Sequence, residues 1–340
     1  MKILFATHPI GVQMQLLAET LRRKGYMATA VCYDKPDCLL NDVNIRYNDG
    51  QSRLRKAMRE TLFTAWAVQN YDIIHFFYGG RTLLPKGLDL PWLKRTGKKV
   101  FVHFRGSDIR NRDFVFHPTE HFLGYNDHST PPPIQSPEQR KILGRWRRYT
   151  DGMFVSTPDL LEIVPEAKLV PQTVDLSQWD YQLEPLGESP EVIRIAYPAS
   201  INKGTEIIQR AIEDLKSRGY PVELVIIKDI PYREVAELYK ACQIGIDNLL
   251  PLGWHGAISV ELMALGRPVI CYINPELASQ RKDLPIVSAT PRDLTKKLEA
   301  LIRDRELRRS LGQQGRAYVE KWHDVNHIVD QLVEIYKGSF

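Results

Sequence analysis

Two kinds of hydrophobic pattern alternate along the first half of the chain. Short runs rich in β-branched and aromatic residues predict strands, and longer segments with helical periodicity predict helices. The strands are predicted at 2–7, 27–33, 72–77, 99–104 and 152–156. The helices are predicted at 12–25, 51–68, 83–96 and 137–149. Strands that alternate with helices in this way are typical of parallel βαβ units.

The same rhythm returns in the second half. Strands are predicted at 192–197, 222–227, 243–247 and 268–272, and helices at 204–218, 231–241, 257–265 and 291–302. We therefore expect an α/β protein made of two facing, Rossmann-like, doubly wound domains. The segment between them carries Pro185, Gly187 and Pro190 and few large aliphatic residues, which is typical of a linker.

These patterns predict four parts of the chain. A first domain covers 1–175, a linker 176–191, a second domain 192–320, and a final helix 321–340. The final helix has a stripe of apolar residues at i, i+3 and i+4 spacing, from Val325 to Ile335, so it must pack against another surface.

The composition is that of an ordinary globular protein. Of 340 residues, 43% are apolar and 26% are charged, which is enough to build two hydrophobic cores. No apolar run approaches the roughly 18 residues that span a bilayer. The first residues already read as a strand rather than as a secretion signal, so we expect a cytoplasmic protein. Four cysteines without CxxC spacing, Cys32, Cys38, Cys242 and Cys271, are expected to be buried thiols.

Charge is distributed unevenly. Residues 1–175 contain 25 Lys and Arg and 18 Asp and Glu, a net charge of +7, whereas residues 176–340 carry a net charge of −2. A basic first half is compatible with nucleic acid, an anionic membrane surface or an acidic substrate, and also with scattered solvated charges.

The segment from Gly253 to Ile270 carries the most specific chemistry. It predicts a loop, a short helix, a glycine stop and a buried strand. Free N–H groups of Gly256, Ala257 and Ile258 at the helix start would face an anion such as a diphosphate. Glu261 follows one turn later on an otherwise apolar helix, where a carboxylate needs a cation or hydroxyl donors such as those of a ribose, unless it is only a helix-surface glutamate.

This segment resembles the donor-binding signature of retaining GT-B glycosyltransferases of family four, the group 1 glycosyl transferases. The family has two glutamates eight positions apart, and Glu261 matches the second, which the resemblance implies holds the ribose hydroxyls. Gly253 occupies the position of the first, which in the family contacts the transferred sugar. Asp247 and His255 are nearby candidates for that contact.

The same resemblance assigns a cation to the donor. Lys203-Gly204 matches the Lys-Gly of the family's Arg-then-Lys-Gly element, while Pro198 replaces its arginine. Lys203 is thus implied to contact the diphosphate, although a lysine before a glycine is also a common solvated start of a helix. Ile230, in the turn 227–231, lies where the family recognises the nucleobase through backbone groups.

Two loops of the first half also resemble family elements. Gly11 follows the first strand, where a backbone amide of the family approaches the donor or acceptor. Residues 102–110 resemble a His-Gly-Ser-Asp element whose histidine contacts the transferred sugar. Arg105 occupies that histidine's position, and His103 lies on the same side of the strand, so both are candidates, with a core histidine as the alternative. Residues 170–175 resemble the element that ends the first domain, and the family's final helix crosses back to the first domain.

Two competing patterns remain. The sequence 117–121 fits an HxxEH zinc motif, with His128 as an extra ligand, but Pro118 and the absence of an acidic ligand downstream argue against it. The run Arg145-Trp146-Arg147-Arg148 could bind nucleic acid by phosphate pairing and stacking, or form a solvated or membrane-facing surface.

The sequence therefore predicts a hexosyltransferase-like enzyme of EC class 2.4. The donor would be a UDP- or GDP-linked sugar and the acceptor a carbohydrate or glycolipid, with retention of configuration, no required metal or other cofactor, and no nucleic acid partner. We expect a role in surface polysaccharide or glycoconjugate synthesis, in the cytoplasm or at the inner face of an anionic membrane. The alternative is a catalytically inactive protein of the same fold that binds a nucleotide sugar or a partner.

Overall fold

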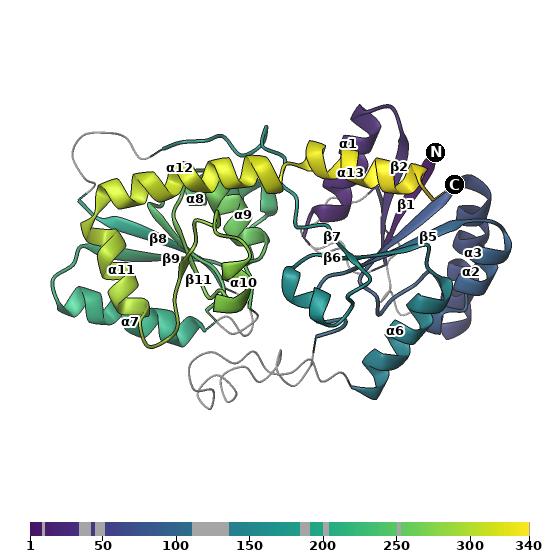
Figure 1. Ribbon diagram of the computed structural model, residues 1–340, viewed down its shortest axis with the longest axis horizontal. Helices are drawn as coiled ribbons and strands as arrows, with labels where there is room; N and C mark the ends of the chain where they lie inside the picture. Colours follow the sequence, from purple (N-terminus) through teal and green to yellow (C-terminus); the bar gives the residue numbers. More distant parts are fainter. Residues whose placement is uncertain are drawn as a thin grey trace. The chain divides into compact units, whose positions relative to one another are not determined.

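A computed structural model describes residues 1–8, 11–33, 42–44, 52–110, 136–183, 191–199, 204–249 and 253–339. These residues form two compact units (Figure 1). The first comprises the described residues up to 110, those from 136 to 171, and the segment from Val325 onward. The second comprises the described residues of 172–324.

The first unit is built on a seven-stranded sheet in the order β3-β2-β1-β4-β5-β6-β7. All its strand pairs are parallel. The strands are β1 (Lys2–Thr7), β2 (Met27–Cys32), β3 (Val43–Asn44), β4 (Ile73–Phe77), β5 (Lys99–Phe104), β6 (Gly152–Val155) and β7 (Lys168–Leu169). The long central strands are buried on both faces, as the continuous apolar runs of the sequence predict.

Helices cover both faces of this sheet. They are α1 (Gln13–Arg23), α2 (Arg53–Asn70), α3 (Leu90–Arg95), α6 (Pro137–Tyr149) and α13 (Val325–Lys337), with 3₁₀ turns at Pro85–Gly87 and Pro158–Glu162. Local sequence sets where the helices begin. Ser136 and Gln139 form a reciprocal capping box at the start of α6, and the Ser52 hydroxyl accepts a hydrogen bond from the Arg55 amide at the start of α2.

One face of the first sheet is lined by aromatic rings. His75 stacks on Phe77 and Phe154, with ring centroids 5.1 and 5.2 Å apart. The Tyr336 hydroxyl of α13 lies 2.5 Å from His75 Nδ1. The stripe on α13 therefore buries its apolar residues from Val325 to Val333, together with Tyr336, within the first unit, and Ile335 is partly exposed.

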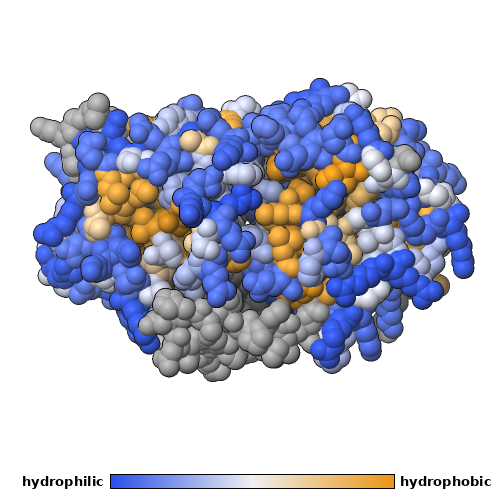
Figure 2. All heavy atoms as spheres, viewed as in Figure 1, coloured by the Kyte–Doolittle hydropathy of each residue, from blue (hydrophilic) through white to orange (hydrophobic). Residues whose placement is uncertain are grey.

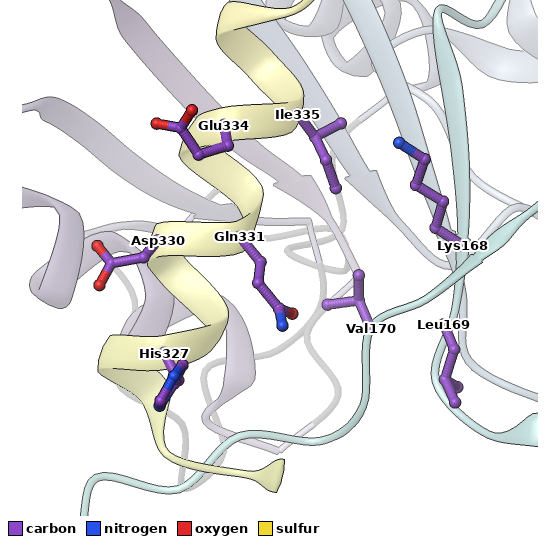
Figure 3. Close-up of a pocket in the computed structure, with 8 residues that line it drawn as sticks. All are labelled: Lys168, Leu169, Val170, His327, Asp330, Gln331, Glu334 and Ile335. Atoms are coloured by element: carbon purple, nitrogen blue, oxygen red, sulfur yellow. The ribbon is translucent and has the colours of Figure 1, made fainter. Parts of the chain in front are cut away.

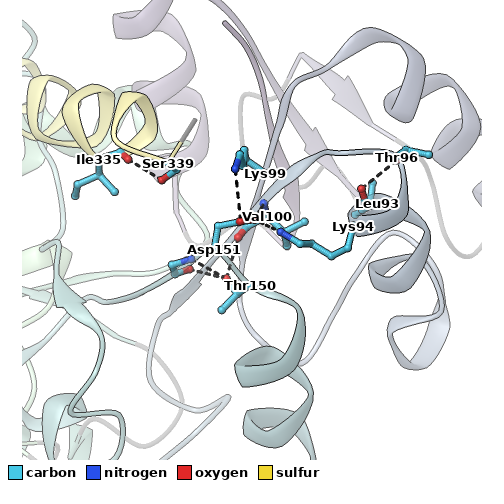
Figure 4. Close-up of polar contacts among 10 residues, drawn as sticks. Leu93, Lys94, Thr96, Lys99, Val100, Thr150, Asp151, Ile335 and Ser339 are labelled. Atoms are coloured by element: carbon cyan, nitrogen blue, oxygen red, sulfur yellow. Dashed lines mark hydrogen bonds and ion pairs between the residues drawn. The ribbon is translucent and has the colours of Figure 1, made fainter.

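The amino-terminal ends of β5 and β6 are tied together by Asp151 (Figure 4). Its carboxylate lies 2.6 Å from Lys94 Nζ and accepts a hydrogen bond of 2.8 Å from the Val100 amide. The Thr150 hydroxyl donates to the Val100 carbonyl. These contacts lie at the end of the sheet opposite the carboxyl ends of the strands, so they serve the fold rather than a ligand.

The second unit is built on a five-stranded parallel sheet in the order β12-β11-β10-β8-β9. Its strands are β8 (Ile193–Pro198), β9 (Val222–Ile227), β10 (Ile244–Ile246), β11 (Val269–Cys271) and β12 (Val287–Ser288). Its helices are α7 (Thr205–Ser217), α8 (Tyr232–Lys240), α9 (Ala257–Ala264), α10 (Pro275–Ser279), α11 (Leu294–Arg303) and α12 (Arg305–Trp322). Two parallel sheets with interleaved helices confirm the predicted α/β class.

Several details differ from the sequence-based predictions. The predicted helix 83–96 is a 3₁₀ turn followed by the six-residue α3, because Pro85, Gly87 and Pro91 interrupt helical hydrogen bonding. The predicted final helix 321–340 begins at Val325 as α13, because α12 ends at Trp322 and is capped by His323. The short strands β3, β7 and β12 lie at or near sheet edges and have too few residues to show a periodicity.

The start of the predicted linker packs on the second unit. Trp179 is buried in the core of that unit, and the Gln182 carbonyl accepts a 2.6 Å hydrogen bond from buried Arg267. The chain passes between units at Pro171–Gln172 and again at Asp324–Val325. These positions differ from the predicted bounds at 175 and 321.

Most of the surface is hydrophilic in the view of Figure 2, with hydrophobic residues showing in parts of each unit. Among the residues that the structure describes, no helix combines the length and hydrophobicity needed to cross a bilayer. Cys32, Cys242 and Cys271 are buried free thiols, as predicted, and Cys38 lies outside the described residues.

The helices α9 and α12 pack closely because of two glycines. A Cβ built on Gly312 of α12 would lie 2.2 Å from the carbonyl oxygen of Gly266, which follows α9 with a φ of 79°. Backbone atoms cannot yield as a flexible side chain can. We predict that Gly312→Ala destabilises the second unit by roughly 1–3 kcal/mol.

Thermal unfolding followed by circular dichroism would measure this loss as a midpoint several degrees lower. Gly144→Ala is the matched control, because a Cβ at Gly144 in α6 meets nothing within 4 Å. That change should stabilise slightly, since alanine is the better helix former. Equal midpoints for Gly312→Ala and the wild type would contradict the close packing.

Candidate functional site

The topology of each sheet marks where a ligand can bind. Open parallel sheets bind ligands at the carboxyl ends of the two strands between which the strand order reverses. In the second unit this reversal lies between β8 and β10, and in the first between β1 and β4. The segments that follow these strands carry most of the residues predicted from sequence.

In the second unit, Asp247 follows β10 and holds the start of α9. Its side chain is only 2% exposed, and Oδ2 accepts hydrogen bonds from the Gly256 amide at 3.2 Å, the Ser259 amide at 3.3 Å and the Ser259 hydroxyl at 2.8 Å. The expectation of a free Gly256 amide is therefore wrong, because a carboxylate of the protein already occupies that donor.

The start of α9 can still receive a ligand. Gly256, Ala257 and Ile258 are partly exposed, whereas the residues on either side of them are buried. The amides of Ala257 and Ile258 belong to the first turn, where helix N–H groups lack intrahelical partners. The positive end of the helix dipole is thus shared between Asp247 and whatever approaches these two residues.

Glu261 lies one turn further along α9 and is 8% exposed. Its Oε1 accepts a 3.0 Å hydrogen bond from the hydroxyl of Tyr232, the first residue of α8. Burial and the Glu261 charge raise the pKa of Tyr232, so its hydroxyl stays protonated and donates. Tyr232 directly follows the turn that contains Ile230, in which Asp229 has a φ of 57°. The structure therefore brings the predicted base-binding turn and the predicted ribose carboxylate together.

His255 is buried rather than presented to a ligand. It is 2% exposed and packs against Trp254, Tyr318 and His323, with ring centroids 5.2, 6.2 and 5.4 Å away. Neither ring nitrogen makes a hydrogen bond of good geometry. Burial lowers the pKa of His255 to about 4, so the ring is neutral at neutral pH and supplies no positive charge.

Gly253 and Pro198 stand where the resemblance expects a glutamate and an arginine. Gly253 has a φ of 81°, a left-handed conformation that side-chain-bearing residues rarely adopt, and its carbonyl accepts a hydrogen bond from the Asn274 amide. Pro198 ends β8, and Gly204 caps α7 with a φ of 84°. Lys203 lies outside the described residues.

In the first unit, Asp108 organises the loops after β4 and β5. This carboxylate is 1% exposed and accepts 2.8 Å hydrogen bonds from the amides of Gly79 and Gly106 and longer ones from the Arg105 amide. A Cβ on Gly79 would lie 2.4 Å from the Phe104 ring, so only glycine fits there. The neighbouring Arg110 is fixed by a two-point contact with Asp159.

His103 and Arg105 lie side by side, as the alternation of a strand predicts. Their Nε2 and guanidinium nitrogen are 3.4 Å apart. The side chain of His103 is 1% exposed, and its Nε2 also lies 2.9 Å from the Val170 carbonyl. Burial, reinforced by the nearby Arg105 charge, lowers the pKa of His103, so the ring is neutral. Burial also lowers the pKa of Arg105 to about 10, which leaves it charged at neutral pH.

Gly11 lies at the reversal point of the first sheet. It has a φ of 55° and precedes α1, and the two residues before it lie outside the described part of the chain. His8 after β1 contacts the ring of Tyr78 after β4, with centroids 4.8 Å apart. The loops after β1, β4 and β5 thus lie at one edge of the first unit.

A groove of about 520 Å³ lies elsewhere in the first unit (Figure 3). It is lined by Lys168, Leu169 and Val170 from the strand β7 region and by five residues of α13: His327, Asp330, Gln331, Glu334 and Ile335. None of the predicted site residues lines it.

The competing patterns fare differently. Trp146 is fully buried and donates a 2.7 Å hydrogen bond to the Gly79 carbonyl, so it cannot stack on a nucleobase, and Arg147 pairs with Glu166. The His117–His121 pattern and His128 lie outside the described residues. Among those that are described, no three His, Cys, Asp or Glu side chains are grouped as metal ligands would be.

Three residues that position the candidate sites, at the carboxyl ends of the strands in the two sheets, were not identified from the sequence. Tyr232, Ser259 and Asp108 all hold a candidate residue or its loop in place. A signal existed for Asp108, because a short polar residue after a glycine at a strand end often accepts loop amides. The partnership of Tyr232 with Glu261 joins residues 29 positions apart and leaves no local pattern.

Comparison with known proteins shows what this chain is similar to. Residues 205–334 match the profile of a family described as glycosyl transferase-like. The matched segment contains Ile230, Asp247, the α9 amides and Glu261, and the predicted enzyme class is the class of this family. No protein of curated function matches the chain in sequence.

Solved structures resemble the whole chain. Sucrose-phosphate synthase from Thermosynechococcus elongatus matches with 15% identity over 99% of both chains and a TM-score of 0.66. HepE of Anabaena in complex with UDP matches with 16% identity over 99% of this chain and 100% of that one, with a TM-score of 0.64. A Listeria monocytogenes protein assigned as a UDP-N-acetylglucosamine 2-epimerase matches with 12% identity over 98% and 95%, with a TM-score of 0.60.

These likenesses establish the fold. The glycosyl transferase-like domain is part of a GT-B fold, which confirms the predicted architecture class. Since an enzyme assigned to another reaction on a nucleotide sugar shares this fold, the fold alone does not specify transfer.

The burial of His255 generates a pH prediction. Its pKa is about 4 in the folded chain and close to 6.5 when unfolded, so the unfolded chain binds more protons between these values. The stability that the neutral ring provides is complete above pH 6.5 and is lost as the pH falls toward 4. In the wild type, protonation of His255 is expected to lower the free energy of unfolding by up to about 3 kcal/mol over this range. We predict that His255→Phe does not show this loss and has nearly the wild-type free energy of unfolding at pH 7.

Urea unfolding at pH 7, 5.5 and 4.5 would measure this difference. The exposed His327→Gln is the control and should follow the wild type at each pH. If His255→Phe and the wild type lose stability in parallel as the pH falls, His255 is not the buried neutral group described above.

Proposed function

We propose that the protein is a retaining glycosyltransferase that moves a hexose from a UDP- or GDP-linked donor to a carbohydrate or glycolipid acceptor. The observation that carries this proposal is the pairing of Glu261 with Tyr232 beside the partly exposed start of α9, within the glycosyl transferase-like domain. Surface polysaccharide or glycoconjugate synthesis would be the setting. The complexes of HepE with UDP, with UDP-glucose and with UDP and glucose support a nucleotide-sugar donor.

The donor would lie across the carboxyl ends of β8 and β10. The turn with Ile230 would present backbone groups to the base, and Glu261 would accept hydrogen bonds from the ribose hydroxyls. Tyr232 holds one carboxylate oxygen and so fixes where the other can reach. The diphosphate would face the amides of Ala257 and Ile258, with Gly256 allowing close approach of the backbone.

Catalysis would rest on electrostatic stabilisation of the leaving group. As the bond between the anomeric carbon and the diphosphate breaks, negative charge grows on the diphosphate oxygens. The two amides, the helix dipole behind them and Lys203 would stabilise that charge. The proposal includes no required metal or other cofactor.

The first unit would bind the acceptor and would also contribute to binding of the transferred sugar. Arg105 keeps its charge next to neutral His103, so it would donate hydrogen bonds to sugar hydroxyls, and Gly11 would let a backbone amide approach the substrates. Asp247 is committed to the start of α9 and His255 to the core, so their roles in sugar binding would be to position the α9 loop.

A second candidate follows from Gly253. Its left-handed backbone carries no side chain where the family pattern has a sugar-contacting glutamate, and Pro198 carries no charge where the pattern has an arginine. These features favour a protein of the same fold that binds a nucleotide sugar without transferring the sugar.

A donor panel separates the two candidates. Purified protein would be titrated with UDP-, GDP- and dTDP-sugars, and sugar release would be followed for each. We expect one nucleotide class to bind in the micromolar to millimolar range and to be turned over. Binding without release for every donor and acceptor would favour the inactive protein, and an absence of any binding would remove both.

Substitution of Glu261 tests the donor site itself. We predict that Glu261→Gln weakens nucleotide affinity about tenfold, because hydrogen bonds to a charged group contribute about 1.5–3 kcal/mol each. Tyr232→Phe should weaken it less, about two- to fivefold, since the carboxylate remains but loses one anchor. Titration calorimetry with UDP and GDP would measure both effects.

The exposed Glu213→Gln on α7 has the same change of charge in the same unit and is the control. It should bind as the wild type does. A Glu261→Gln variant that keeps its thermal midpoint and its nucleotide affinity would place the ribose elsewhere.

A further inference from the structure

The helix α2 exposes four of its large apolar side chains. In a soluble domain the large apolar residues of a helix normally face the core. Here the inward face carries Phe63 and Val68, which pack on the core. It also carries Glu60, Thr64 and Ala67, all three at most 2% exposed. The outward positions carry Leu54, Met58, Leu62 and Trp66, which are 79%, 59%, 64% and 43% exposed.

These four side chains form one continuous stripe. They recur every fourth residue, and an α-helix turns 100° and rises about 1.5 Å per residue, so the stripe runs for about 18 Å and spreads over roughly 120° of the helix surface. They are four of the ten large hydrophobic side chains that are exposed in the described part of the chain. Such a concentration on one helix marks a surface that binds something. Figure 1 shows α2 at one flank of the first unit.

The charges on α2 point to the nature of the partner. Arg55 is exposed within the stripe, and Lys56 and Arg59 are partly exposed beside it. The acidic residue of α2 is Glu60, whose side chain is buried. The outward face of this helix therefore combines apolar groups and cations without an exposed carboxylate.

We propose that the outward face of α2 docks the protein on an anionic lipid bilayer. Leucine, methionine and tryptophan side chains would enter the boundary between headgroups and acyl chains, with the helix lying parallel to the surface. The exposed Arg55 would pair with a lipid phosphate, and Lys56 and Arg59 would add positive charge beside it. The net charge of +7 on residues 1–175 adds a longer-range attraction to the same surface.

The bilayer surface also fits the proposed chemistry. A protein that lies on a membrane through its first unit meets glycolipid acceptors at a high local concentration, and in this respect the inference rests on the proposed function. The docking itself requires neither donor nor transfer.

Vesicle co-sedimentation of the full-length protein tests the docking. The vesicles would contain phosphatidylcholine alone or with 30 mol% phosphatidylglycerol. We expect the wild type to bind the anionic vesicles and to bind the neutral ones at least tenfold more weakly. The double variant Leu62→Gln/Trp66→Gln should lose at least tenfold in binding to anionic vesicles, and Arg55→Gln should lose less.

Matched controls are available on other elements. Ile226→Gln on β9 and Leu307→Gln on α12 also replace exposed apolar residues, 45% and 37% exposed, and should bind vesicles as the wild type does. Circular dichroism midpoints would establish that each variant is folded. A loss of binding shared by the controls would overturn the assignment to α2.

Tryptophan fluorescence provides a second measurement. Trp66 is 43% exposed in the described structure, so its emission should shift to shorter wavelength when anionic vesicles are added. The shift should be absent in Trp66→Phe, which keeps an apolar group and should still sediment with the vesicles. A shift of equal size in Trp66→Phe would show that another tryptophan meets the lipid and would overturn the proposal.

Two further results would overturn the proposal in favour of another occupant. If the stripe pairs with a second copy of the chain, sedimentation equilibrium without lipid would show a dimer for the wild type and a monomer for Leu62→Gln/Trp66→Gln. An absence of binding to anionic vesicles at low salt would exclude the bilayer. Titration of the same samples with UDP distinguishes failure of the docking proposal from failure of the proposed function. A sample can bind UDP without binding vesicles, and it can bind vesicles without binding UDP.

Discussion

The carboxylate of Asp247 accepts two backbone amides and a hydroxyl at the start of α9, and Asp108 accepts amides from the loops after β4 and β5. In both units a carboxylate taken out of water is stabilised by N–H groups that the ends of strands and helices leave without partners. Each interaction therefore provides hydrogen bonds both to the buried carboxylate and to the N–H groups that would otherwise lack a partner. The loops at these edges are consequently held before any substrate arrives.

Asp247 occupies only part of the anion-binding capacity of the N-terminus of α9. A helix start is a general site for anions, and in α9 the protein itself supplies one of them. The fixed carboxylate orients the first turn, while the outer part of that turn remains partly exposed. Preorganised dipoles of this kind need not rearrange when charge develops on a ligand, which is the physical basis of electrostatic catalysis.

The fold could be predicted from the sequence because its signals are local. Runs such as Ile73–Phe77 and Lys99–Phe104 identify buried parallel strands by composition alone, and Ser136 with Gln139 marks a helix start within four residues. The glycine and prolines that reduce 83–96 to a turn and the short α3 are equally local, and they outweigh the helical periodicity of that segment.

The site could be predicted only in part, because its geometry depends on distant partners. The sequence identifies Glu261 as a carboxylate that needs a hydrogen-bond donor, but the group that donates to it is the hydroxyl of Tyr232 on another helix. It places His255 next to Gly256, but whether that ring faces a ligand or the core depends on Trp254, Tyr318 and His323 around it. The prediction of free amides failed for Gly256 because Asp247, nine residues earlier, reaches back to it.

The left-handed backbone at Gly253 restricts how this loop could be redesigned. A glutamate introduced there would have to adopt a conformation that costs an ordinary residue about 1–2 kcal/mol, while the Gly253 carbonyl stays bonded to the Asn274 amide. The side chain would also leave the backbone in a direction set by that conformation. To place an acidic side chain in this loop, an engineer would have to replace the loop as a whole, because exchanging one amino acid would not change the path of the chain.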